Sequence, residues 1–225
     1  MKNTLIKTVC LILILSFSLV PLTACGENPD IYTAEITIKN YGTVKIELDH
    51  KSAPVTVKNF VTLARSGFYD GLTFHRIVKG FMIQGGAPDI TSSVYPDNNP
   101  GEFLANGFDN RISHTRGVIS MARAGSGFGD DEYGYNTASS QFFICTADSE
   151  FLDGNYAAFG WVTEGMRIID RVVNDYIDNT DRSEDNLFYG YEGGSIQISS
   201  MRPVIEKIVI KGGQNLDKAE EQIED

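Results

Sequence analysis

Short apolar runs separated by glycine-containing turns recur along most of this chain, and this spacing favours a fold built from short strands. Around the turn Asn40-Tyr41-Gly42, apolar residues alternate with polar ones from Ile36 to Leu48, which is the two-residue period of a hairpin. Further apolar runs of strand length follow at 74–78, 81–83, 118–121, 142–144, 157–162 and 204–210. The sequence therefore predicts many short antiparallel strands.

Two segments have the different spacing of an amphipathic helix. The first is expected to be capped by Ser52, to carry Pro54 in its first turn and to end at Gly67. Its apolar face consists of Val57, Phe60, Val61 and Ala64. The second helix has Thr163 as its predicted cap. Its apolar positions are Met166, Ile169 and Val173.

Short strands with two isolated helices predict a mainly β fold. We expect a closed eight-stranded antiparallel β-barrel capped by the two α-helices, because closure removes exposed strand edges. An open α+β sandwich is also compatible with the pattern. No change in composition divides the chain, so one domain is expected over 31–211, followed by an acidic C-terminal tail at 212–225.

The N-terminus has the features of an export signal. Lys2 and Lys7 accompany an apolar run at 9–22, which has the length of a signal-peptide core and is too short to span a membrane comfortably. The run ends in Leu22-Thr23-Ala24-Cys25, which resembles the lipobox of bacterial lipoproteins. This resemblance implies a signal peptide at 1–24, a lipid on Cys25 and a short tether at 25–30.

A lipid on Cys25 would hold the domain on the extracytoplasmic face of the cell membrane. The alternatives are an ordinary cleaved signal, or an N-terminal membrane helix with a chance cysteine. The net charge of −11 argues against nucleic acid as a partner and against electrostatic attraction to anionic lipid. With Cys10 in the signal and Cys25 modified, Cys145 has no partner for an internal disulfide, and we expect it to be a buried, unreactive thiol.

Four sequence blocks carry a specific resemblance. They are Phe74-His75-Arg76-Ile77 with Gly80-Phe81-Met82-Ile83-Gln84-Gly85-Gly86, residues 114–122 (HTRGVISMA), residues 140–144 (SQFFI) and residues 151–160 (FLDGNYAAFG). In this order they resemble the cyclophilins, and with the flanking elements the resemblance covers 31–211. It implies a cofactor-free peptidyl-prolyl cis/trans isomerase acting on proline-containing polypeptides.

The chemistry of the reaction agrees with these residue types. Rotation about an Xaa-Pro bond is slow because resonance gives the C–N bond partial double-bond character, and an enzyme accelerates it by binding the twisted amide best. A guanidinium suits this task because it is always charged and presents several N–H groups in a rigid fork. By resemblance the donor is Arg76, assisted by Gln84, and Phe81 completes the catalytic set.

The resemblance also assigns the substrate-binding residues. Phe81, Met82, Phe143 and Leu152 match the lining of an apolar slot for the proline ring. His75 and Gln141 match positions at its edge, whereas Ala122 and the backbone at Arg123 match the stretch that receives the substrate backbone.

Three of the substrate-binding residues that the resemblance implies, Phe151, Tyr156 and Arg123, depart from the family. Phe151 stands where many members have tryptophan, so weaker inhibition by cyclosporin is expected; Tyr156 stands where many have histidine. Arg123 replaces the usual asparagine, which should matter little if only its backbone contacts substrate. An apparent insertion at 126–134, which contains Asp130, Asp131 and Glu132, could bias recognition toward basic substrates.

Other features give no separate function. His75 and His114 are expected to be structural, since the reaction needs no proton relay. The acidic residues at 178–185 lack the spacing of a calcium-binding loop, so no metal site is predicted. We therefore expect a monomeric foldase for exported proteins. A prolyl-peptide binding module or chaperone is the main alternative, and a structural surface lipoprotein is a weaker one.

Overall fold

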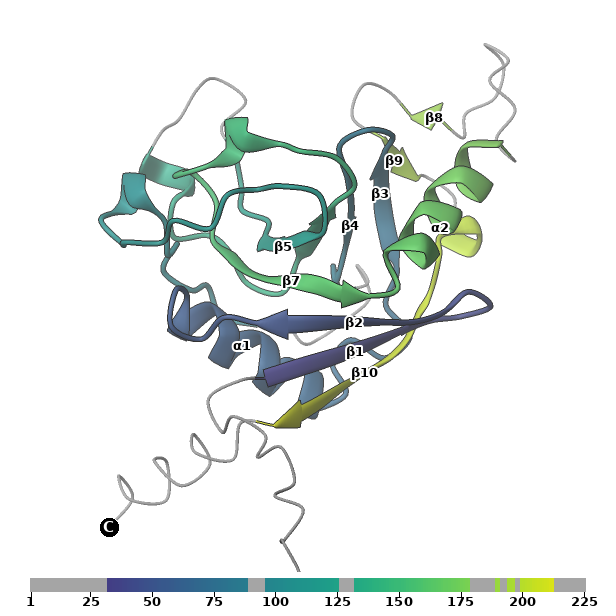
Figure 1. Ribbon diagram of the computed structural model, residues 1–225, viewed down its shortest axis with the longest axis horizontal. Coiled ribbons are helices and arrows are strands. Elements are labelled where there is room, and N and C mark those ends of the chain that lie inside the picture. The colour runs from purple at the N-terminus through teal and green to yellow at the C-terminus, as the bar shows by residue number, and fades with distance from the viewer. Residues whose placement is uncertain are drawn as a thin grey trace, which may run out of the picture.

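The computed structural model describes residues 32–88, 96–125, 132–178, 189–190, 194–196 and 199–212 (Figure 1). The predicted signal peptide, Cys25, the tether, most of the 126–134 insertion and the tail after Gly212 lie outside these residues. Among the helices that are described, none has the length and apolar character needed to cross a membrane.

Within the described residues, antiparallel pairing joins ten strands into one sheet, in the order β10-β1-β2-β7-β5-β6-β4-β3-β9-β8. The strands are β1 (Tyr32–Ile38), β2 (Gly42–Leu48), β3 (Phe74–Val78), β4 (Met82–Gly85), β5 (Val118–Met121), β6 (Phe142–Cys145), β7 (Ala158–Glu164), β8 (Tyr189–Gly190), β9 (Ser195–Ile196) and β10 (Ile205–Gly212). The predicted first hairpin is confirmed as β1 and β2. Asn40 adopts a φ of 68° in its turn, a conformation that asparagine tolerates better than most residues.

The sheet curls into a half-barrel, and the prediction of a closed eight-stranded barrel was wrong in closure and in strand number. One isolated bridge, between Thr73 and Val204, joins the β3 side to the β10 side in the part of the chain that is described. Two hydrogen bonds flank it, from the Phe74 amide to the Pro203 carbonyl at 2.9 Å and from the Ile205 amide to the Leu72 carbonyl at 2.7 Å. Closure stops there because β3 pairs on its outer side with β9, through Arg76 and Ser195.

The first predicted helix is confirmed as α1 (Pro54–Arg65), but its predicted cap was wrong. The hydroxyl of Ser52 instead donates to Asp49 Oδ2 at 2.7 Å. The free amides at the helix start belong to Val55 and Thr56, and they donate to the two carboxylate oxygens of buried Glu102 at 3.0 and 2.7 Å. A carboxylate 46 residues away therefore caps this helix.

The second predicted helix is confirmed as α2 (Met166–Asp178). Thr163 does not cap it, because Thr163 lies in β7 and the chain turns at Gly165, which has a φ of 93°. The helix packs against β2 and buries Ile169, Val172 and Val173. Four short 3-10 helices complete the described elements: η1 (Leu104–Asn106), η2 (Glu132–Gly134), η3 (Glu150–Leu152) and η4 (Ser199–Met201).

Aromatic rings form the centre of the core. Phe60 of α1 lies 5.5 Å from Phe142 of β6 and 5.3 Å from Phe159 of β7, measured between ring centroids, so the helix contributes its apolar face to the concave side of the sheet. Burial of one such ring stabilises a fold by about 2–3 kcal/mol. A second, smaller apolar cluster of Met82, Phe143, Cys145 and Leu152 adjoins the functional site.

Candidate active site

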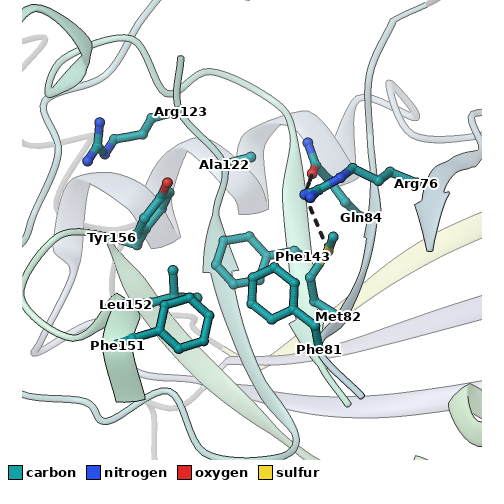
Figure 2. A pocket seen from close by; sticks show the side chains of 10 residues that line it. All are labelled: Arg76, Phe81, Met82, Gln84, Ala122, Arg123, Phe143, Phe151, Leu152 and Tyr156. Atoms are coloured by element: carbon teal, nitrogen blue, oxygen red, sulfur yellow. Dashed lines mark hydrogen bonds between the residues drawn. The ribbon is translucent and has the colours of Figure 1, made fainter. Parts of the chain in front are cut away.

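A cavity of about 270 Å³ opens between the β3–β4 hairpin, the segment after β5, strand β6, and η3 with the turn that follows it (Figure 2). Its lining is an apolar floor with two guanidinium groups on the wall. The lining residues are Arg76, Phe81, Met82, Gln84, Ala122, Arg123, Phe143, Phe151, Leu152 and Tyr156.

Strand pairing fixes the polar wall. Arg76 of β3 pairs in register with Gln84 of β4, and Arg76 Nη1 donates a hydrogen bond to Gln84 Oε1 at 3.2 Å. The side-chain amide nitrogen of Gln84, Nε2, in turn donates to Gln141 Oε1 at 3.0 Å. The orientation of the Arg76 guanidinium is therefore set by the side chains of Gln84 and Gln141. Partial burial lowers the pKa of Arg76, but an arginine remains fully charged at neutral pH.

Apolar side chains form the floor and outer lip. Met82, Phe143 and Leu152 are buried in the floor. The rings of Phe81 and Phe151 lie 5.3 Å apart at the mouth, and Phe151 is 72% exposed. Such a slot can enclose a small saturated ring without offering competing hydrogen bonds.

A hydrogen-bonded network of Asp153, His114 and Ser120, of which the last two are buried, lies behind this floor. His114 Nδ1 lies 2.8 Å from Asp153 Oδ1, and His114 Nε2 lies 3.0 Å from Ser120 Oγ. The His114 ring stacks on Phe143 with centroids 6.0 Å apart and 18° between planes. These are the residue types of a hydrolase triad, but His114 and Ser120 are fully buried and cannot reach a substrate. Through the stacked His114 ring, these hydrogen-bonded side chains instead support Phe143.

The surroundings of His114, Asp153 and the neighbouring Cys145 shift the pKa of each side chain. Burial lowers the pKa of His114, which favours the neutral ring. Partial burial would raise the pKa of Asp153, but hydrogen bonds from the His114 amide and the Ser113 hydroxyl outweigh it, so that pKa is lowered. Burial also raises the pKa of Cys145 to about 12, as expected for an inert thiol.

The structure brings together ten of the twelve predicted catalytic and substrate-binding residues, and it leaves His75 and Gln141 outside the lining. Gln141 instead contacts Gln84 through its side chain, and its carbonyl accepts a hydrogen bond from the Ala122 amide at 2.9 Å. The resemblance to the family implied a role only for the backbone of Arg123, whereas its side chain lines the cavity. Within the described ranges, no three or more His, Cys, Asp or Glu residues group closely enough to bind a metal ion.

Residues 33–188 match the family model described as cyclophilin type peptidyl-prolyl cis-trans isomerase/CLD. The chain belongs to this family, as its four sequence blocks predicted. It is therefore an isomerase of Xaa-Pro peptide bonds. The two alternatives from the sequence, a pure binding module and a structural surface protein, are not supported.

Individual relatives agree with the family match. A peptidyl-prolyl cis-trans isomerase of Helicobacter pylori is 43% identical over 143 residues, which cover 62% of this chain and 80% of that protein. An isomerase of Arabidopsis thaliana is 38% identical over 161 residues, or 69% of this chain and 90% of that protein. A crystal structure of a cyclophilin type isomerase of Cryptosporidium parvum has a TM-score of 0.60 at 27% identity, and covers 81% of this chain and 98% of that one.

Proposed function

We propose that this isomerase acts on exported polypeptides while tethered to the membrane through a lipid on Cys25, and that Arg76 is its catalytic donor. The observation that carries the assignment of Arg76 is its guanidinium, oriented by Gln84 on the wall of an apolar cavity. A proline ring fits the apolar part, and the preceding amide would then lie beside the charged wall.

The proposed catalytic step is a rotation in which no covalent bond forms or breaks. Phe143, Met82 and Leu152 hold the proline ring while the carbonyl before it swings. Hydrogen bonding from Arg76 to the prolyl nitrogen favours a pyramidal nitrogen, which removes the resonance that keeps the amide planar. Because this contact is strongest in the twisted state, it lowers the barrier more than it strengthens ground-state binding.

An isomerisation assay on Ala-Pro and Phe-Pro peptides tests the role of Arg76. The chain carrying Cys25→Ser is compared with the same chain carrying Arg76→Ala, and Arg111→Ala serves as the control because the Arg111 side chain is 76% exposed and lies outside the cavity lining. Loss of one preorganised donor should lower kcat/KM by about 100-fold or more. A normal rate in Arg76→Ala would remove Arg76 from the mechanism.

The cellular role rests on the N-terminal sequence. The apolar run at 9–22 and the cysteine that closes its lipobox-like end support export and lipid attachment. Metabolic labelling with an alkyne fatty acid, followed by membrane fractionation, tests this part separately. The wild-type chain should carry the label and sediment with membranes, whereas Cys25→Ser should do neither. Label on the Cys25→Ser chain, or an unlabelled wild-type chain, would disprove attachment at Cys25.

Export is tested by protease accessibility. Protease added to intact cells of a one-membrane host, or to spheroplasts of a two-membrane host, should digest the wild-type protein. A cytoplasmic protein of the same cells is the control and should stay intact. Protection of both proteins to the same extent would show that the isomerase works inside the cell.

A further inference from the structure

Arg123 lies at the centre of an aromatic cage. Its guanidinium carbon is 4.7 Å from the ring centroid of Tyr156, 5.3 Å from that of Tyr135 and 5.6 Å from that of Phe103. The rings of Phe103 and Tyr135 pack edge to face at 5.1 Å, and both are buried. A cation close to several ring faces is held by the electrostatic field of the rings, most strongly where water is excluded.

The same side chain is also tied to the turn that carries Tyr156. Arg123 Nε donates a hydrogen bond to the carbonyl of Asn155 at 2.9 Å. The guanidinium thus contacts two adjacent residues, Asn155 through this bond and Tyr156 through its ring. Phe103 immediately precedes η1 and Tyr135 immediately follows η2. The guanidinium therefore links the turn before β7 to two other segments at this end of the cavity.

Tyr156 transmits this anchoring to the cavity. Its ring packs edge to face on Phe143 with centroids 5.8 Å apart, and both residues line the cavity. Figure 2 shows Arg123 above Tyr156, on the side of the cavity opposite Arg76. The asparagine usual in the family is shorter and uncharged, so it could not make the cation–π contacts.

We propose that Arg123 is a positioning residue for isomerisation: it fixes the Tyr156 ring as one wall of the proline slot through the cation–π contacts and the bond to Asn155. The inference rests on the proposed use of the cavity as the proline site. It assigns a role to the side chain of Arg123, whereas the resemblance to the family gave a role to its backbone alone. A wall held in place before the substrate arrives spares the cost of ordering it on binding.

A double-mutant cycle on an Ala-Pro peptide tests the proposal. Arg123→Gln removes the charge, Arg123→Lys keeps it without the planar fork, and Tyr156→Leu removes the ring. Arg123→Gln should lower kcat/KM by about tenfold, mostly through KM, since the wall contacts the proline ring in every state. Arg123→Lys should lower kcat/KM as well, but by less than Arg123→Gln does, because the positive charge remains. In the Tyr156→Leu background, Arg123→Gln should lower kcat/KM by less than about twofold.

The proposal would be overturned if Arg123→Gln lowered kcat/KM by the same factor in the Tyr156→Leu background as in the wild type. Arg111→Gln removes one exposed positive charge elsewhere and should leave the kinetics unchanged. Thermal unfolding of each variant is measured alongside, and if Arg123→Gln does not fold, the cycle is completed with Arg123→Lys. Failure of the proposed function would differ, because isomerisation would then be absent in the wild type or insensitive to Arg76→Ala.

Discussion

Arg76 and Gln84 face each other across the β3–β4 pair, with Arg76 Nη1 and Gln84 Oε1 3.2 Å apart. The amide of Gln84 donates onward to Gln141 Oε1, so each group of this chain orients the next. A guanidinium has several rotatable bonds, and a fixed acceptor removes much of that freedom before substrate binds. The register of two short strands therefore sets the aim of the proposed donor.

Replacing Gln84 should separate orientation from charge. In Gln84→Leu, Arg76 keeps its charge but loses the hydrogen bond to Gln84, so we expect kcat on an Ala-Pro peptide to fall by about tenfold with a smaller change in KM. Gln141→Leu, one step farther from Arg76, should cost less than Gln84→Leu. Equal losses in the two variants, or none in Gln84→Leu, would show that Arg76 does not depend on this chain.

Phe151 should control sensitivity to cyclosporin. Its ring forms the exposed lip of the cavity beside Phe81, and phenylalanine lacks the indole N–H that tryptophan offers at this position in many relatives. We expect weak inhibition of the wild type and about tenfold tighter inhibition of Phe151→Trp, the value of one net hydrogen bond. Inhibitor titration measures both constants. Tight, stoichiometric inhibition of the wild type would contradict the prediction.

Glu102 should matter for stability more than an exposed glutamate does. Its carboxylate accepts the amides of Val55 and Thr56 at the start of α1, and Glu102→Ala would leave these donors without their partner. The expected loss in the free energy of unfolding is about 2 kcal/mol. Glu164→Ala is the control, because the Glu164 side chain is 66% exposed in a surface pair with Lys45 and should change stability by less than about 0.5 kcal/mol. Urea unfolding measures both.

Stability should fall as the pH drops below the ordinary histidine pKa of 6.5. Burial lowers the pKa of His114, so the unfolded chain binds a proton on this histidine at a higher pH than the folded chain does. The stabilisation is fully present above pH 6.5 and is lost as the pH falls through the pKa of the folded state. Urea unfolding between pH 5 and 8 should show this loss, and His114→Gln should show less of it. An identical pH profile in His114→Gln would assign the effect to another group, of which His75, whose pKa burial also lowers, is the first candidate.

Local patterns predicted the elements of this fold better than their assembly. The alternation around Asn40 and the apolar face with Phe60 gave the first hairpin and α1, because each pattern reflects a single buried face. The cap of α1 could not be found in the same way, since Glu102 approaches it from a distant loop. Closure failed as a prediction because it depends on how β3 and β10 meet, which no local pattern encodes.

The candidate site shows the same difference between what local sequence patterns predict and what only the folded structure reveals. The sequence blocks identified Arg76, Gln84 and the apolar floor, because strand register places these residues together. The side chain of Arg123 was underestimated, since its role depends on rings at 103, 135 and 156 that only the folded chain gathers. Phe103 and Tyr135 belong to none of the four sequence blocks, so no pattern in the sequence predicts that they cluster with Arg123.

The first and last described strands are neighbours, with Tyr32 opposite Gly212 and pairing along nearly all of β1. During synthesis, β1 leaves the ribosome long before β10 exists, and its outer edge stays without its native partner until β10 has emerged. An unpaired edge of this kind is open to pairing with another nascent chain. An enzyme whose reaction speeds a slow step in folding thus completes its own sheet only after the roughly 170 residues that separate β1 from β10 have been translated.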